Sequence, residues 1–162
     1  MPFQPHCDHA LISSISQLHA AYAYCLDSDE LECWPNFFSD DAVYRILASE
    51  NERLSLPMPL LILKGRKMLS DRILALRKAN LYNIHTDHHV IGCPRVEVNN
   101  GSFVRAWTQF SVHQVDQEGI PNIFSLGVYR DVININDGSL VIESRDVILT
   151  TNTILNLLSC PL

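Results

Sequence analysis

The sequence predicts an α+β fold in which a curved, mostly antiparallel sheet wraps around N-terminal helices to form a cone. Apolar residues recur with helical spacing in the first half, 8–80. The spacing changes to two in the second half, 83–154, where Asn- and Gly-rich turns separate long apolar segments. A chain of 162 residues fits one domain, 1–162, ending in an apolar tail at 155–162.

Two helices are expected before the first strand. Apolar residues at steps of four and three predict the first helix, 8–26, and they are Leu11, Ile15, Leu18, Tyr22 and Cys25. Ser28 or Asp29 can cap a second, short helix. Its apolar residues are Leu31, Trp34 and Phe38. Pro35 must interrupt it, because proline lacks the amide donor and clashes with the preceding turn.

The chain between 42 and 80 alternates between extended and helical patterns. We predict a short strand at 42–47 and an irregular loop at 48–59, which holds two prolines. The apolar run 60–63 is either a strand or the lead-in to a third helix at 66–80. Leu69, Ile73 and Leu76 mark the apolar face of that helix.

Four segments of the second half predict long strands. They are 83–98, 102–115, 122–135 and 140–154. The turn sequences between them are 99–101, 116–119 and 136–138, where Asn and Gly supply positive φ angles. Strands joined by such tight turns are sequential antiparallel neighbours, and the dry face of their sheet must pack against the helices.

Composition excludes several classes of function. The net charge of -6 argues against a nucleic-acid partner, because such proteins need a basic face. No segment approaches the roughly 18 apolar residues of a membrane span. The first residues lack the basic start and apolar run of a signal peptide, so we expect a cytoplasmic protein.

One sequence feature is half of an iron–sulfur signature. Cys7-x-His9 matches the first half of a Rieske motif, and Cys25 follows at a fitting distance. The second half requires C-x-x-H, but Ser28 stands where the histidine should be. Because such a cluster needs four ligands, we interpret the spacing as a coincidence.

A histidine-rich segment offers a second candidate metal site. His85, Asp87 and His89 alternate along a predicted strand, with His88 beside them. Two histidines and a carboxylate could bind iron. Residues two apart on a strand are separated by nearly 7 Å, however, so three of them converge poorly on one ion. We therefore expect no metal in this chain.

A third candidate is an acid–base site between the sheet and the helices. If the chain is an enzyme, His89 would act as general base with Asp27 to orient it, together with Tyr22 and Asp131. Tyr44 is a further polar group. A tyrosine on an apolar helix face is more often part of the core, so we assign no catalytic residue in the leading interpretation.

Two apolar features remain. Trp34, Phe37 and Phe38 lie close to Tyr44 and predict an aromatic cluster in the core. The ending 154–162 is unusually apolar for a terminus. It either closes the core of this chain or docks onto another subunit, and we favour docking because the predicted sheet is complete without it.

Runs along nearly the whole chain carry a family resemblance. They are, in order, 21–28, 34–38, Asp41, 44–45, 50–51, 56–57, 68–73, 76–80, 89–92, 94–96, 127–132 and 161–162. Together they resemble the small (beta) subunits of Rieske-type aromatic-ring-hydroxylating oxygenases. The resemblance extends to the benzoate-like branch that acts on aromatic carboxylates, with the small subunits of terephthalate dioxygenase and salicylate 5-hydroxylase.

The resemblance implies a nuclear-transport-factor-like, or cystatin-like, cone, which agrees with the pattern. It also implies a structural small subunit without a cofactor, in an assembly of three large (alpha) and three small subunits in which small subunits touch one another. The large subunit would carry the Rieske [2Fe-2S] cluster and the mononuclear Fe(II). One departure is His88, where the resemblance leads us to expect arginine; a neutral histidine cannot replace its bidentate contact.

Two alternatives stay open from the sequence. One is a stand-alone dehydratase or isomerase that uses His89 with Asp27 or Asp131. The other is a small-molecule binding protein with the same pocket and no chemistry.

Overall fold

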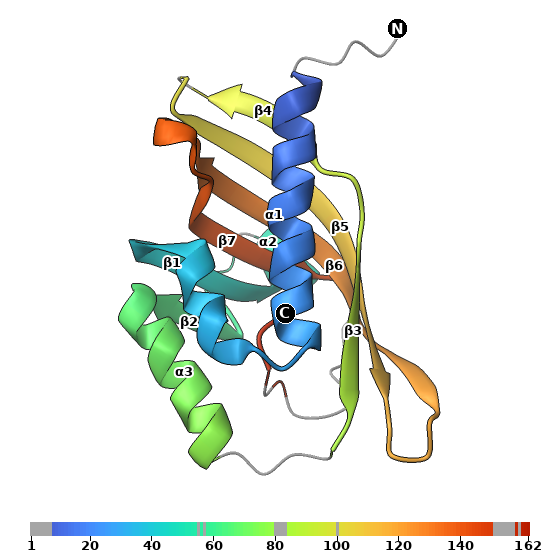
Figure 1. Cartoon of the computed structure of the whole chain (residues 1–162). Helices are drawn as coiled ribbons and strands as arrows, with labels where there is room; N and C mark the ends of the chain where they lie inside the picture. Colours follow the sequence, from blue (N-terminus) through green and yellow to red (C-terminus); the bar gives the residue numbers. More distant parts are fainter. Residues whose placement is uncertain are drawn as a thin grey trace, which may run out of the picture.

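The structure, a computed structural model, describes residues 8–54, 56, 58–79, 84–99, 101–150, 158 and 160–162. The helical elements are α1 (His9–Asp27), η1 (Leu31–Phe37), α2 (Ser49–Arg53), α3 (Arg66–Lys78) and η2 (Asn136–Gly138). The strands are β1 (Phe38–Ala48), β2 (Leu61–Lys64), β3 (Thr86–Ile91), β4 (Arg95–Asn99), β5 (Phe103–Val115), β6 (Pro121–Asn134) and β7 (Val141–Leu149). Figure 1 shows their arrangement.

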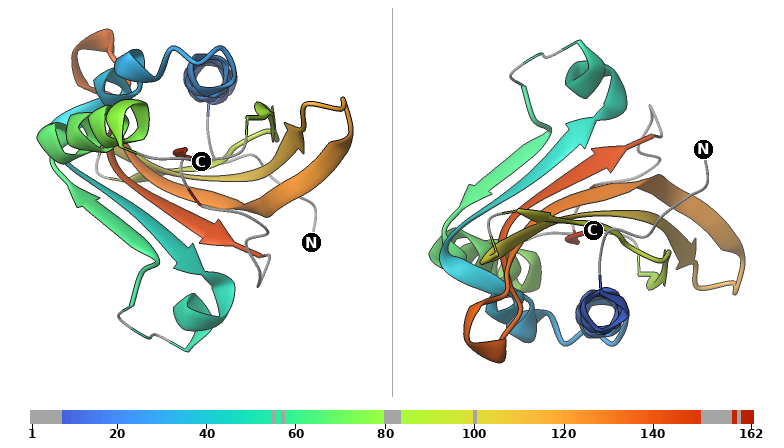
Figure 2. Two further views of the ribbon diagram at one scale, coloured as in Figure 1. Left: turned by 90° about the horizontal axis from the view of Figure 1, so that it is seen from below. Right: turned by 90° about the horizontal axis from the view of Figure 1, so that it is seen from above.

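The described strands form one curved sheet in the order β2-β1-β7-β6-β5-β3, with β4 also paired to β5. All pairs are antiparallel except β1 with β7. Figure 2 shows α1 end-on in the hollow of the bent sheet, with α2 on the far side. The predicted α+β cone with sequential β5, β6 and β7 is therefore confirmed.

The predicted single strand over 83–98 is wrong, because two strands occupy this segment. β3 and β4 pair with opposite ends of β5 and are separated by residues 92–94. Pro94 has no N–H to donate to a sheet ladder, so pairing stops before it and resumes at Arg95. The predicted turns hold, since Gly101, Gly119 and Gly138 have φ angles of 75°, 81° and 73°.

The helix α1 confirms the prediction of 8–26 to within one residue. Asp8 caps it by accepting a hydrogen bond from the amide of Ala10 at 3.1 Å. Its apolar face turns to the sheet and is fully buried at Ile15 and Tyr22. The predicted face of α3 is likewise buried, at Leu69, Ile73 and Leu76.

The segment after α1 differs from the prediction in two ways. Neither Ser28 nor Asp29 caps the next helix; Glu30 takes that position without a side-chain cap, and Asp29 adopts a φ of 58° that reverses the chain. The helix is a 3-10 helix that contains Pro35, and it ends before Phe38, which starts β1. An apolar residue at 38 suits the buried face of either element, so periodicity could not separate them.

The predicted loop at 48–59 is partly wrong, because α2 begins it. The predicted strand at 42–47 begins four residues earlier, and the ambiguous run 60–63 forms strand β2. The helix expected at 66–80 is α3, and residue 80 lies outside the described residues.

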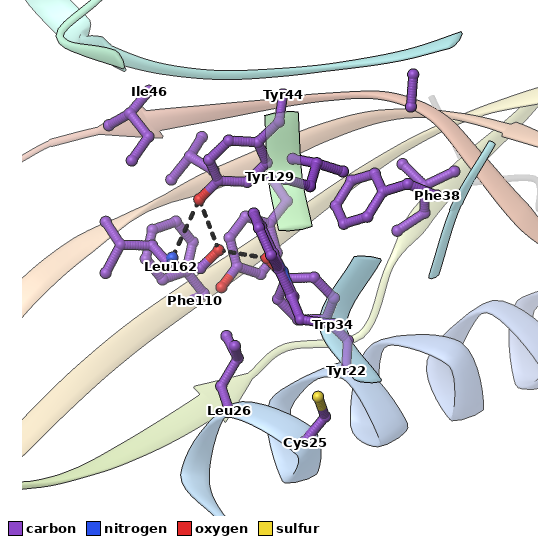
Figure 3. Close-up of a cluster of buried hydrophobic side chains, with 14 of the residues drawn as sticks. Tyr22, Cys25, Leu26, Trp34, Phe38, Tyr44, Ile46, Phe110, Tyr129 and Leu162 are labelled. Atoms are coloured by element: carbon purple, nitrogen blue, oxygen red, sulfur yellow. Dashed lines mark hydrogen bonds between the residues drawn. The ribbon is translucent and has the colours of Figure 1, made fainter. Parts of the chain in front are cut away.

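The predicted aromatic cluster forms the core between α1, η1 and the sheet (Figure 3). Trp34 packs edge-on against Phe38 and Tyr44, at centroid distances of 5.4 and 5.3 Å. Phe37 is only partly buried and contacts Tyr22.

The end of the sequence also enters this core. The main-chain oxygen of Leu162 accepts hydrogen bonds from Tyr22 at 2.7 Å and from Tyr44 at 3.1 Å (Figure 3). Leu162 itself is 2% exposed. Docking of the tail onto another subunit is therefore wrong for this residue, which closes the core of its own chain; residues 151–157 and 159 lie outside the described residues.

Candidate functional site

Asp27 and His89 form a close polar pair between α1 and β3. The carboxylate of Asp27, the last residue of α1, accepts the backbone N–H of His89 at 2.9 Å. Its other oxygen lies 2.6 Å from Nδ1 of the His89 ring. A carboxylate at Nδ1 selects the tautomer that leaves Nε2 able to accept a proton, which is the arrangement of a general base. The sequence predicted this pair correctly as neighbours.

The remaining nitrogen of His89 is not placed to reach a substrate. Nε2 is buried and has no hydrogen-bond partner among the described residues. The ring as a whole is 1% exposed. The pair therefore joins the end of α1 to β3, and catalysis would require an opening between them.

The neighbouring His88 faces the same carboxylate. Its Nδ1 lies 3.8 Å from Oδ2 of Asp27, and the ring is exposed. An arginine at this position could reach Asp27 with two N–H donors. Asp27 is therefore a candidate partner within this chain for an arginine at this position.

Tyr22 and Asp131 belong to a separate polar cluster inside the cone. Asp131 on β6 receives two hydrogen bonds at 2.8 Å from Arg145 on β7, and both side chains are fully buried. The guanidinium lies between the rings of Tyr22 and Tyr129, 4.2 Å from each centroid. Buried charges of this kind are held by pairing and by the aromatic faces.

His19 completes the cluster from α1. Burial lowers the pKa of its ring even though the hydrogen bond to Asp131 opposes this shift, so the ring is neutral at neutral pH. A carboxylate only accepts, so Nε2 of His19 donates to Asp131 at 2.9 Å. Nδ1 then accepts from the hydroxyl of Thr108 at 3.2 Å.

Each titratable group of this cluster has one protonation state at neutral pH. Burial alone would raise the pKa of the Asp131 carboxyl, but the charge and hydrogen bonds of Arg145 and the bond from His19 lower it to about 2. Burial raises the pKa of Tyr22. Asp131 is thus ionised and Tyr22 protonated at neutral pH, and neither is accessible. The cluster can stabilise the core, but it offers no route for a substrate.

An open pocket of about 430 Å³ lies beside the pair of Asp27 and His89. Its lining joins the end of α1 to the start of β3 and to the end of the sequence, at Leu26, Asp27, Ser28, Asp29, Leu31, Ile84, His85, Thr86, Asp87 and Cys160. Asp27 reaches the pocket, whereas His89 is not part of its lining.

The iron–sulfur half-motif does not converge. Cys7 lies outside the described residues. His9 and Cys25 stand 16 positions apart on α1, which at 1.5 Å per residue is about 24 Å. These two residues cannot ligate one cluster.

Comparisons with known proteins identify the family. Residues 9–146 match the SnoaL-like domain. The chain is 33% identical to the terephthalate 1,2-dioxygenase terminal oxygenase component subunit beta 1 of a Comamonas species, over 91% of this chain and 96% of that protein. It is 30% identical to the anthranilate 1,2-dioxygenase small subunit of Burkholderia cepacia, over 91% of this chain and 92% of that protein.

A solved structure agrees with these relatives. A beta subunit assigned to an aromatic-ring-hydroxylating dioxygenase of Novosphingobium aromaticivorans superposes with a TM-score of 0.87 at 36% identity, covering 94% of this chain and 97% of that chain. The chain belongs to the small subunits of aromatic-ring-hydroxylating dioxygenases. The cone of this small subunit is thus the SnoaL-like one, and its enzyme class is that of a dioxygenase subunit.

Sequence reasoning missed two polar residues of this small subunit. His19 lies four residues after Ile15 and three before Tyr22, so helical spacing already placed it on the buried face of α1. Arg145 stands directly opposite Asp131 in the register of β6 and β7. That pairing becomes visible only once the hairpin register is known.

No described helix is long and apolar enough to cross a membrane.

Proposed function

We propose that this chain is the structural, non-catalytic small subunit of a multicomponent Rieske non-haem iron oxygenase that hydroxylates an aromatic carboxylate. The observation that carries the proposal is the likeness to the terephthalate 1,2-dioxygenase beta subunit, which extends over nearly the full length of both proteins. Terephthalate and anthranilate, the substrates in the relatives' names, are both aromatic carboxylates. The likeness to both supports this substrate class.

In this proposal the large subunit supplies the redox cofactors, namely the Rieske [2Fe-2S] cluster and the mononuclear Fe(II). Three large and three small subunits form the assembly, which resides in the cytoplasm. The arrangement of the polar residues supports such a division of labour. Arg145, Asp131 and His19 are paired inside the core, and the Asp27 and His89 pair fastens α1 to β3.

The alternative of a stand-alone dehydratase or isomerase rests on the Asp27 and His89 pair. The four residues expected for it do not form one open site. Tyr22 and Asp131 contact Arg145 in the core, and both are fully buried. His89 is closed off from the adjacent pocket, which further disfavours direct proton transfer to a substrate.

Purification from the native host tests the proposal. The chain carries an affinity tag, the host grows on an aromatic carboxylate, and the purified particle is analysed for mass, protein content and iron. We expect equal numbers of this chain and of a large oxygenase subunit, with the absorbance of a Rieske cluster. A colourless, monomeric chain that converts a small substrate by itself would instead establish the dehydratase or isomerase alternative.

A further inference from the structure

Three side chains of different chemistry converge where β3 begins. They are His85, Asp87 and Cys160, and one ligand atom from each lies within 4.8 Å of the other two. His85 and Asp87 flank the first residue of β3, whereas Cys160 comes from the end of the sequence, 73 positions after Asp87. All three line the pocket of about 430 Å³.

The first two residues place a buried carboxylate oxygen close to an imidazole nitrogen. Oδ1 of Asp87 is buried and has no hydrogen-bond partner among the described residues. It lies 3.5 Å from Nε2 of His85. The side-chain amide of Gln114 lies 3.2 Å from that same Nε2, and it must turn away for the single lone pair of Nε2 to bind a metal. A proton or a metal ion between Oδ1 and Nε2 would satisfy the buried oxygen.

We propose that His85, Asp87 and Cys160 bind one zinc ion at this corner of the pocket. An imidazole nitrogen, a thiolate and a single carboxylate oxygen are ligands that zinc accepts together, whereas magnesium and calcium prefer oxygen alone. Three protein ligands leave the fourth tetrahedral position for water from the pocket. Binding releases the thiol proton of Cys160 to the solvent.

The distances are close to those of a zinc centre. Ligand bonds of about 2.0–2.3 Å in a tetrahedron place neighbouring ligand atoms about 3.3–3.8 Å apart. His85 and Asp87 already have this separation, at 3.5 Å. Cys160 must approach by at most about 1.5 Å. It belongs to no helix or strand, so a shift of this size breaks no ladder of backbone hydrogen bonds.

Neighbouring contacts hold Cys160 near the site. Two residues before it, the carbonyl of Leu158 accepts a hydrogen bond at 2.6 Å from Arg72 on α3. Two residues after it, Leu162 is anchored in the aromatic core. The described residues that line the pocket include three aspartates and no lysine or arginine, so no fixed cation competes with the metal there.

This site goes beyond the proposed function and departs from the expectation of a chain without metal. Its zinc would be redox-inert and would fasten the end of the sequence to β3, while the irons stay in the large subunit. That expectation considered His89 as the third ligand. His89 instead bonds Asp27, and the chain brings Cys160 to the position.

The test uses the full chain alone, after treatment with a chelator to remove bound metals. Zinc is titrated in competition with a chromophoric chelator, and cobalt(II) replaces zinc for spectroscopy. We expect one zinc per chain and a thiolate-to-cobalt charge-transfer band in the near ultraviolet. The Cys160→Ser variant should lose the band and bind zinc at least tenfold more weakly.

Matched controls separate this site from general thiol or histidine binding. Cys93→Ser removes an exposed cysteine and His9→Gln an exposed histidine, and both should keep the band and the affinity. If Cys160→Ser does not fold by circular dichroism, His85→Gln carries the same comparison. Absence of stoichiometric zinc, or an unchanged affinity in the site variants, overturns the proposal. Neither result bears on assembly with a large subunit, which the purification from the native host tests separately.

Discussion

Replacing Asp131 by asparagine should destabilise this subunit strongly, because it leaves the charge of Arg145 unpaired in the core. Both side chains are 0% exposed, and two hydrogen bonds of 2.8 Å join them. Removing one partner of a buried ion pair costs about 3–5 kcal/mol. The rings of Tyr22 and Tyr129 still contact the guanidinium in the variant, so we expect the lower end, about 3 kcal/mol.

Urea unfolding of the isolated subunit, followed by circular dichroism, measures this loss. Asp29→Asn is the matched control, because Asp29 also accepts hydrogen bonds from an arginine, Arg77, but is largely exposed. Asparagine tolerates the positive φ of Asp29, so the control adds little backbone strain. An exposed pair contributes at most about 1 kcal/mol. If Asp131→Asn lost no more free energy of unfolding than Asp29→Asn, the reasoning about the buried charge would be refuted.

Three further predictions concern pH, packing and iron. The pKa of Asp131 is lowered from 3.8 to about 2, and this shift contributes about 2 kcal/mol to the free energy of unfolding. The contribution is present above pH 4 and is lost as the pH falls towards 2. The free energy of unfolding of Asp131→Asn should therefore depend less on pH in this range. Gly127→Ala should lower stability by about 3 kcal/mol in urea, because the new Cβ would lie 2.3 Å from the carbonyl oxygen of Ile148. His89→Ala should reduce stability or assembly with unchanged iron per large subunit; iron loss from an intact complex would contradict the structural role.

The fold was predictable where local patterns decide it. The spacing of apolar residues defined α1, and Asn and Gly defined the hairpins of β5, β6 and β7. The parallel pairing of β1 with β7 was not predictable, because it joins Tyr44 to Arg145 across about 100 residues without a turn signal. Such pairings depend on how the whole sheet bends, which periodicity does not report.

The candidate site was also predictable only in part. Asp27 ends a strongly periodic helix and His89 lies in a strand, so their meeting required only that α1 pack on β3. Tyr22 and Asp131 were assigned to the same site on general chemistry, but they belong to the separate buried cluster around Arg145. The role of Cys160 depends on the path of the end of the sequence, which carries no periodic signal.

Side chains fill the space between α1 and the sheet, and this packing is the physical argument for a structural role of the subunit. A cone of this kind can hold a ligand between its helix and its sheet, and the polar residues that would serve a reaction lie there. In this chain Phe110 stacks on Tyr129 at 4.2 Å, and Arg145 fills the space between Tyr129 and Tyr22. Leu162 closes the side towards Tyr44. Because Arg145, Asp131 and His19 bond to one another inside the core, they support a structural role for this subunit and not a reaction within its cone.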